Sequence, residues 1–358
     1  MVGPRACAGV AALGVAALIT GCGETTGTPV NAPTSAPSSS GPSTLTVNVG
    51  GADSAHPLYD FLAFYPSTIS AHPGDTLRLV NPTKETPHTV TFGVLPDHSN
   101  QPALLTPGVG FTAIAGGPCV STQPVTATTT TCPGAPAAPP PAAPAGTPPA
   151  EVALPAPFSG QPFYNSGIFL GGQTAVLPLS ADIKPGAYRF ICLLHPTMAA
   201  TLTVVPAGSP IQAADALTSA ADRQLAADRT DAATVAAGVA TPADGTVQAG
   251  AVGKELTVNM FFPSTLTVSA GQTVTWKNDG YEPHVLVFGR TITPEDPLVF
   301  GAPTLGPGSA YAGGLAVSGL FAGKPFPSST YALKFTTAGS YPYTSAIHPG
   351  MAGVITVQ

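Results

Sequence analysis

The segment Phe190-Ile-Cys-Leu-Leu-His-Pro-Thr-Met198 carries three side chains that can bind a metal ion. Cys192, His195 and Met198 offer a thiol, an imidazole and a thioether, and one tight loop can bring all three to a single ion. The strand-like stretches YRFI before the loop and ATLTVV after it would hold both of its ends in a sheet. The alternative is a core strand with a buried Cys and Met and a His at its edge. The combination of all three residue types favours a metal site.

The chain repeats its own pattern at low fidelity. Ser43-Thr-Leu-Thr-Val-Asn48 returns as Glu255-Leu-Thr-Val-Asn259, TPHTVTFG as EPHVLVFG, and PGAYRFICLLHPTM as AGSYPYTSAIHPGM. Val, Thr, Leu and Phe alternate with other residues between turns marked by Gly and Pro, which is typical of β-sandwiches. We therefore predict an all-β protein with two sandwich domains, at residues 44–205 and 254–358.

The first copy of the TPHTVTFG pattern supplies a further imidazole, that of His88. Two His, one Cys and a weak axial Met are the ligands of a blue-copper electron-transfer site. Cu(I) prefers sulfur and Cu(II) prefers nitrogen, so this mixed set serves both states. We predict one copper ion bound by His88, Cys192, His195 and Met198.

With these four residues the chain resembles the cupredoxins of the plastocyanin and azurin type, and its C-x-x-H-P-x-M loop is most similar to that of the amicyanins. The resemblance covers both predicted sandwiches. It implies an eight-stranded Greek-key fold and one type 1 copper in the first domain. It also implies that Asn81, whose counterpart is Asn278, helps to fix the ligand loops.

The second domain lacks the thiol. The repeat places Ser345 where the first domain has its cysteine, so no blue site can form there. His284, His348 and Met351 remain, and such a set could still hold Cu(I) weakly. The favoured interpretation is nevertheless a degenerate sandwich that is kept for packing or docking.

The N-terminal residues resemble an export signal of the bacterial lipoprotein type. Residues 1–21 contain one positive charge and a short apolar stretch, followed by Leu18-Ile-Thr-Gly-Cys22. Cleavage before Cys22 and lipid on its sulfur would anchor the protein to the outer face of the cell membrane. Residues 22–43 are rich in Thr, Pro, Ser and Gly and predict a flexible tether.

The first domain carries a long insertion, at about residues 95–163. Its Pro- and Ala-rich part is expected to be extended or disordered. Cys119 and Cys132 flank a Thr-rich stretch within the insertion, and an oxidising compartment outside the cytoplasm favours a disulfide between them.

Residues 206–253 are predicted to form a helical linker. Ser209 is a suitable N-cap, Pro210 fits the first helical position, and Gln212 completes a capping box. A narrow apolar stripe is expected to dock the helix, made of Ala214, Leu217, Ala221 and Leu225.

Charged residues make up 8% of the chain and the net charge is −6, which argues against nucleic acid as a partner. An enzyme of the multicopper oxidase type needs additional paired histidines, and seven histidines without a His-x-His motif do not supply them. We therefore expect a non-enzymatic, lipid-anchored electron carrier. The alternative function is copper storage or delivery.

The redox partner is not identified by the sequence. We expect it to dock on an apolar surface patch where the ring edge of His195 lies among Leu193, Leu194 and Pro196.

Overall fold

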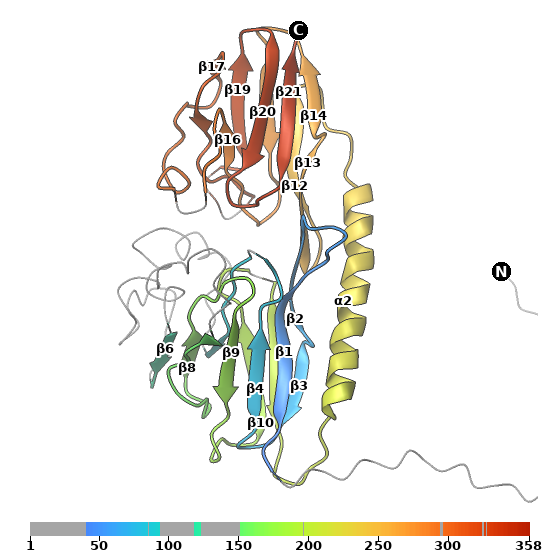
Figure 1. The fold of residues 1–358 in the computed structure, drawn as a ribbon, viewed down its shortest axis with the longest axis vertical. Coiled ribbons are helices and arrows are strands. Elements are labelled where there is room, and N and C mark those ends of the chain that lie inside the picture. The colour runs from blue at the N-terminus through green and yellow to red at the C-terminus, as the bar shows by residue number, and fades with distance from the viewer. Residues whose placement is uncertain are drawn as a thin grey trace, which may run out of the picture. The chain divides into compact units, whose positions relative to one another are not determined.

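The computed structural model describes residues 41–84, 86–93, 118–122, 151–195, 197–293, 296–323, 326 and 328–358. These residues belong to one compact unit, Ser39–Gln358, which is built of β-sheets and one long helix (Figure 1). The prediction of a mostly β protein with one helix is therefore confirmed, while the division into two sandwich domains and the Greek-key connectivity stay predictions. The predicted signal, the lipidation site Cys22 and nearly all of the tether lie outside the described residues.

The first half contains eleven described strands in two sheets. Alternating apolar residues point into the space between the sheets, where Leu45, Leu77, Phe92 and Leu202 are buried. The strands are β1 (Thr44–Gly51), β2 (Tyr59–Tyr65), β3 (Thr68–Ala71), β4 (Thr76–Val80), β5 (Thr91–Gly93), β6 (Pro118–Ser121), β7 (Glu151–Val152), β8 (Phe163–Ser166), β9 (Thr174–Pro178), β10 (Gly186–Ile191) and β11 (Ala199–Val204).

The second half has the same plan with its own core around the buried Trp276. β14, β21, β20, β16 and β18 form one sheet, and the remaining strands belong to a ten-stranded sheet. The strands are β12 (Thr246–Val252), β13 (Leu256–Phe262), β14 (Thr265–Val268), β15 (Thr273–Lys277), β16 (Leu286–Phe288), β17 (Ser309–Tyr311), β18 (Ala316–Val317), β19 (Thr330–Phe335), β20 (Gly339–Ser345) and β21 (Ala352–Val357).

The ten-stranded sheet runs through both halves. β2 of the first half pairs antiparallel with β13 of the second, with Tyr59 opposite Val258 and Phe61 opposite Leu256. A shared hydrophobic cluster covers this junction and consists of Phe61, Ala63, Tyr65, Ala221, Ala232, Leu256 and Val258. The two halves are therefore joined by backbone hydrogen bonds and by a common core.

The second half begins earlier than the sequence predicts. β12 pairs antiparallel with β13 and parallel with β15, just as β1 pairs with β2 and β4. The predicted match of residues 43–48 to residues 255–259 is therefore wrong, because residues 256–259 belong to β13, the counterpart of β2. β12 also lies inside the segment that the sequence predicts to be a helical linker, residues 206–253.

The helix α2 (Ala214–Ala237) occupies part of that segment and runs along β1, β2 and β13 (Figure 1). The predicted capping box is wrong, because the N-cap is Ala213 and no side chain caps the helix. Ser209 instead lies in a turn: its N–H donates to Pro206 O at 3.0 Å, and its carbonyl oxygen contacts His72 Nε2 at 2.8 Å. Of the predicted stripe, Leu217 and Ala221 are buried, Leu225 is half-buried and Ala214 is exposed.

Only parts of the predicted insertion at residues 95–163 are described. They include β6, which pairs with β8, and β7, which pairs with β9. Cys119 is buried in β6, whereas Cys132 lies outside the described residues, so their predicted pairing stays a prediction. The described part of the chain contains no helix with the length and apolarity that a bilayer span requires.

Candidate metal centre

Two neighbouring strands of the six-stranded sheet bring the predicted ligands together. His88 lies just before β5, and Cys192 follows the last residue of β10. Because β5 and β10 pair, with Thr91 opposite Ile191, the two ligands meet at the same end of the sheet. A backbone bridge with Phe169 fixes His88, through N–H to O distances of 3.0 and 2.9 Å.

The loop between β10 and β11 is closed by its own backbone. The N–H of Cys192 donates to Met198 O at 3.0 Å, and the N–H of Met198 donates to His195 O at 3.1 Å. Met198 is fully buried, in the core of the first half. Pro196, which the sequence expectation places in the docking patch, lies outside the described residues.

The donor atoms converge on one point. His88 Nδ1 lies 3.1 Å from His195 Nδ1, and Cys192 Sγ lies 3.8 Å from His88 Nδ1 and 3.5 Å from His195 Nδ1. Bonds of about 2.0–2.3 Å, as a first-row ion such as zinc forms, would place three donors around one ion roughly 3–4 Å apart. All three side chains are buried, so water competes little for the ion. The residues therefore fit a single small transition-metal ion.

Thr89 supports the sulfur, and the sequence does not single it out. Its N–H donates to Cys192 Sγ at 3.3 Å, and its Oγ1 accepts a hydrogen bond from Leu193 N at 2.8 Å. The repeat contains a signal for this role, since Val285 takes the place of Thr89 in the copy where Ser345 takes the place of Cys192.

Asn81 holds the chain that leads to His88. This buried amide donates from Nδ2 to Thr86 O at 2.9 Å and to Phe169 O at 3.3 Å, while its Oδ1 accepts from Thr83 N and Thr83 Oγ1. Asn278 makes the equivalent contacts in the second half, to Glu282 O at 2.7 Å and to Phe321 O at 3.2 Å.

Gly50 allows the back of the His88 ring to lie against β1. It sits in a bulge of this strand with a φ of 85°, and a Cβ added there would lie 2.4 Å from His88 Nε2. Gly250 in the bulge of β12 has the same relation to His284, at 2.6 Å. Glycine inside a strand often marks a bulge or a close approach, and that is the signal which the sequence carries for these two residues.

The charges of the site favour a thiolate. Burial by itself would raise the pKa of Cys192, but the neighbouring His195 and His88 outweigh it and hold that pKa well below its usual range. Burial opposes a charge on His195 as well, yet the sulfur of Cys192 and then Glu282 raise the pKa of His195 to about 9. Burial lowers the pKa of His88. These shifts favour a thiolate at Cys192 and a neutral imidazole at His88.

The predicted residues of the second half also come together. His284 Nδ1 lies 3.1 Å from His348 Nδ1, and Ser345 Oγ lies 3.4 Å from His348 Nδ1. Met351 is fully buried. Burial, followed by the neighbouring His348, holds the pKa of His284 well below its usual range, so this ring is neutral.

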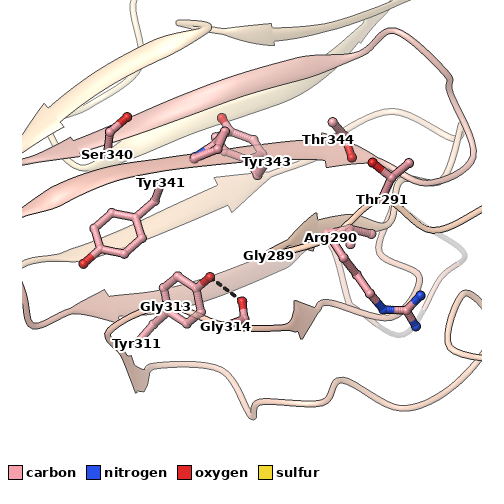
Figure 2. Close-up of a pocket in the computed structure, with 12 residues that line it drawn as sticks. Gly289, Arg290, Thr291, Tyr311, Gly313, Gly314, Ser340, Tyr341, Tyr343 and Thr344 are labelled. Carbon is pink, nitrogen blue, oxygen red and sulfur yellow. Dashed lines mark hydrogen bonds between the residues drawn. The ribbon is translucent and has the colours of Figure 1, made fainter.

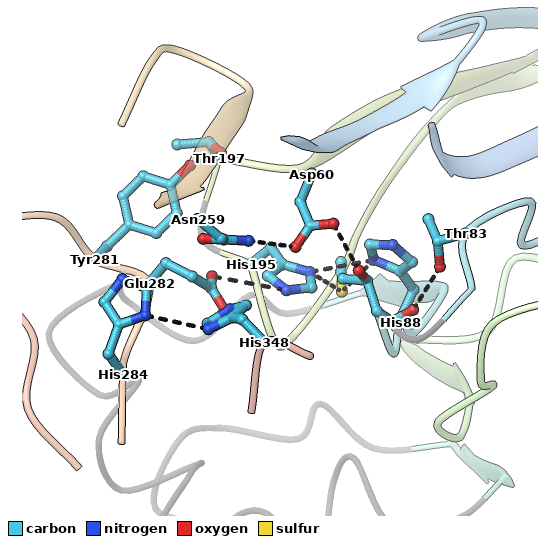
Figure 3. Close-up of polar contacts among 12 residues, drawn as sticks. Asp60, Thr83, His88, His195, Thr197, Asn259, Tyr281, Glu282, His284 and His348 are labelled. Carbon is cyan, nitrogen blue, oxygen red and sulfur yellow. Dashed lines mark hydrogen bonds and ion pairs between the residues drawn. The ribbon is translucent and has the colours of Figure 1, made fainter. Parts of the chain in front are cut away.

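The expected surface patch is wrong. His195 is 4% exposed and Leu193 and Leu194 are buried as well. Glu282, in the turn after β15, faces the outer ring edge of His195, with Oε2 3.9 Å from Nε2 (Figure 3). The pairing of β2 with β13 brings this turn of the second half against the metal loop of the first. Tyr281 joins the same contact through Thr197, at 3.4 Å between the hydroxyl oxygens.

The second half also contains a pocket that is separate from the predicted metal ligands (Figure 2). Its lining includes Tyr311, Tyr341 and Arg290 but none of the predicted ligands. The Arg290 guanidinium is paired with Asp296 at 3.2 Å, so it does not offer an unpaired charge to a ligand.

The chain is similar in sequence to plastocyanins. Plastocyanin of Scenedesmus fuscus is 38% identical over 117 residues, which are 32% of this chain and 100% of that protein. Chloroplastic plastocyanin of Chlamydomonas reinhardtii is 33% identical over 152 residues, which are 42% of this chain and 92% of that protein. No family model matches the chain.

Solved structures with similarity to part of the chain include a Cu(I) form of an amicyanin mutant. It is 27% identical, covers 35% of this chain and 90% of its own, and has a TM-score of 0.21. A purple cupredoxin from Nitrosopumilus maritimus is 21% identical, covers 32% of this chain and 100% of its own, and has the same TM-score of 0.21. Scores this low do not by themselves establish a shared fold.

Proposed function

This chain belongs to the cupredoxin family, and we propose that it carries single electrons on one type 1 copper ion held by His88, Cys192, His195 and Met198. The observation that carries the proposal is the convergence of the buried Cys192 sulfur and two imidazole nitrogens, all within 4.8 Å of one another. Bound copper would supply the chemistry by alternating between Cu(I) and Cu(II).

The protein residues would keep the site nearly unchanged in both oxidation states. The two Nδ1 atoms and the sulfur are held by buried loops whose backbone groups are already hydrogen-bonded. Thr89 N–H stabilises negative charge on Cys192 Sγ, and the closed loop fixes His195 relative to Met198. Because little has to move when the charge changes, electron transfer through this site is fast.

Absorption spectroscopy on the copper-loaded full chain tests this function. We expect an intense blue band that disappears on reduction and returns on oxidation, and that is absent in Cys192→Ala. Ser345→Ala changes the equivalent position of the second half and serves as the matched control, with its band retained. A colourless protein that exchanges copper readily would contradict electron transfer and support the alternative, copper storage or delivery.

Export and a lipid anchor complete the proposal. The small Gly21 before Cys22 supports cleavage at that bond and lipidation of the new N-terminus. Cellular fractionation tests this part: the wild-type chain should be found with membranes, and Cys22→Ala should lose both the lipid mass and the membrane association. Equal fractionation of the two chains would contradict the anchor.

A further inference from the structure

The second half keeps nearly the whole ligand arrangement of the first, apart from the thiol. The rings of His284 and His348 have centroids 4.8 Å apart and an interplanar angle of 60°. The rings of His88 and His195 have the same centroid distance and an angle of 63°. In both halves the two Nδ1 atoms are 3.1 Å apart. The two imidazoles of the second half are thus held in the same relative geometry as the two predicted copper-binding imidazoles of the first half.

The loop that carries the second pair is also closed in the same way. Ser345 N–H donates to Met351 O at 2.9 Å, and Met351 N–H donates to His348 O at 3.0 Å. These are the same two bonds that join Cys192, His195 and Met198. Met351 therefore occupies the place of Met198, and both are fully buried.

Glu282 orients one of these rings from behind. Its Oε1 lies 3.5 Å from His348 Nε2, and its side chain is 15% exposed (Figure 3). A carboxylate behind an imidazole keeps the proton on the nitrogen that faces it and leaves the lone pair on the other nitrogen free for a metal. In that tautomer the lone pair of His348 Nδ1 faces His284, whose Nδ1 lies 3.1 Å away.

We propose that His284, His348 and Met351 bind a second copper ion as Cu(I), with Glu282 as the positioning residue. Two imidazole nitrogens and a thioether sulfur add no negative charge, and such a donor set suits a soft monovalent ion better than a hard divalent one. Ser345 contributes only a hydroxyl, so oxidation of this ion gives no thiolate-to-copper absorption band. The second site goes beyond the proposed electron carrier and does not depend on it.

Competition with a chromogenic Cu(I) chelator under reducing conditions tests the site directly. A full-length chain with both His88→Ala and Cys192→Ala loses the first site, and we expect it still to bind one Cu(I). Adding Met351→Leu, which keeps the volume and removes the sulfur, should abolish or weaken that binding. Met260→Leu, in β13 outside the site, is the matched control. No bound Cu(I) in the double variant, or unchanged affinity in Met351→Leu, would overturn the proposal.

The role of Glu282 has its own readout. In Glu282→Gln, the nitrogen NMR signals that report the tautomer of His348 are expected to shift, and the Cu(I) affinity of the second site should fall by about 10- to 100-fold. Unchanged signals together with unchanged affinity would remove Glu282 from the site.

A variant that gains a signal tests the site in a way that misfolding cannot imitate. Ser345→Cys supplies the missing thiolate, and in the Cys192→Ala background it should restore a blue band. A folded Ser345→Cys chain without that band would show that the second ligands are not in place. The chelator assay needs no absorption by the first site, so failure of the proposed electron carrier and failure of this inference give different results.

Discussion

At the scale of single residues, the position of His88 depends on a glycine that carries no chemistry itself. The absent side chain of Gly50 is what lets the imidazole lie against the bulge of β1 with its Nδ1 directed toward Cys192. Metal affinity is therefore expected to depend on the backbone of β1 at Gly50, although β1 contributes no ligand.

We therefore expect Gly50→Ala to displace His88 and to weaken copper binding. Its Cβ would lie 2.4 Å from His88 Nε2. Gly74→Ala is the matched control, because Gly74 has a similar φ of 88° but nothing within 4 Å of the added atom. Both variants carry the strain of a left-handed alanine, about 1–2 kcal/mol. Copper titration should separate them, and equal copper affinity would contradict this account of the site.

Thr89→Val should destabilise the protein without removing the blue band. Valine keeps the backbone N–H that faces Cys192 but leaves the buried N–H of Leu193 without its acceptor. An unpaired buried donor costs about 1–3 kcal/mol. Chemical denaturation measures this loss, with the exposed Thr46→Val as a control that should change little. A Thr89→Val chain as stable as wild type would show that the Leu193 bond contributes nothing.

At the scale of elements, α2 is stabilised by what it touches. No side chain caps it. Gln224 accepts from Ser67 N and donates to Phe64 O, while Tyr65 donates to Asp228 at 2.5 Å. Such tertiary contacts, more than helix propensity, usually decide whether a helix forms.

Leu217→Ala should therefore lower the free energy of unfolding by about 2–5 kcal/mol, the usual cost of deleting a buried leucine side chain. Leu217 is 2% exposed and packs into the core of the first half. Arg223→Ala, on the exposed side of the same helix, should be nearly neutral. Urea denaturation measures the unfolding midpoints of both variants. Equal midpoints would mean that the Leu217 side chain of the helix contributes nothing to the core.

At the scale of the whole molecule, the two halves share a sheet, a hydrophobic cluster and a polar contact. Asn259 in β13 donates from Nδ2 to Oδ2 of Asp60 in β2, at 2.8 Å. Separating the halves would expose apolar side chains on both sides of the junction, such as Phe61 and Val258. The halves are therefore expected to unfold together.

Two probes can test this cooperativity, one in each half. Trp276 is the single tryptophan of the chain and is buried in the second core, while the blue band would report on the first. We expect both signals to change at the same denaturant concentration, because coincident probes indicate a two-state transition. Separate midpoints would show that the halves unfold independently.

The sequence determined the mostly β architecture, the repeat and the residues that converge at both sites. Side-chain alternation and short motifs are local properties of the sequence. The spacing of Cys192, His195 and Met198 is such a motif, so it can be recognised without the tertiary structure. The sequence comparison misplaced the start of the second half, because Leu-Thr-Val-Asn occurs both in β1, at residues 45–48, and in β13, at residues 256–259. It also placed a helix cap at Ser209, whose true partners, Pro206 and His72, are set partly by a distant loop.

Only the tertiary structure decided what lies around the metal ligands. The glycine behind His88, the N–H of Thr89 on the sulfur, and Glu282 between His195 and His348 all come from segments far from the metal loop. Thr89 meets the metal loop because β5 pairs with β10, and Glu282 meets it because β2 pairs with β13. Strand pairing over such separations depends on the packing of whole sheets, which no local pattern in the sequence records.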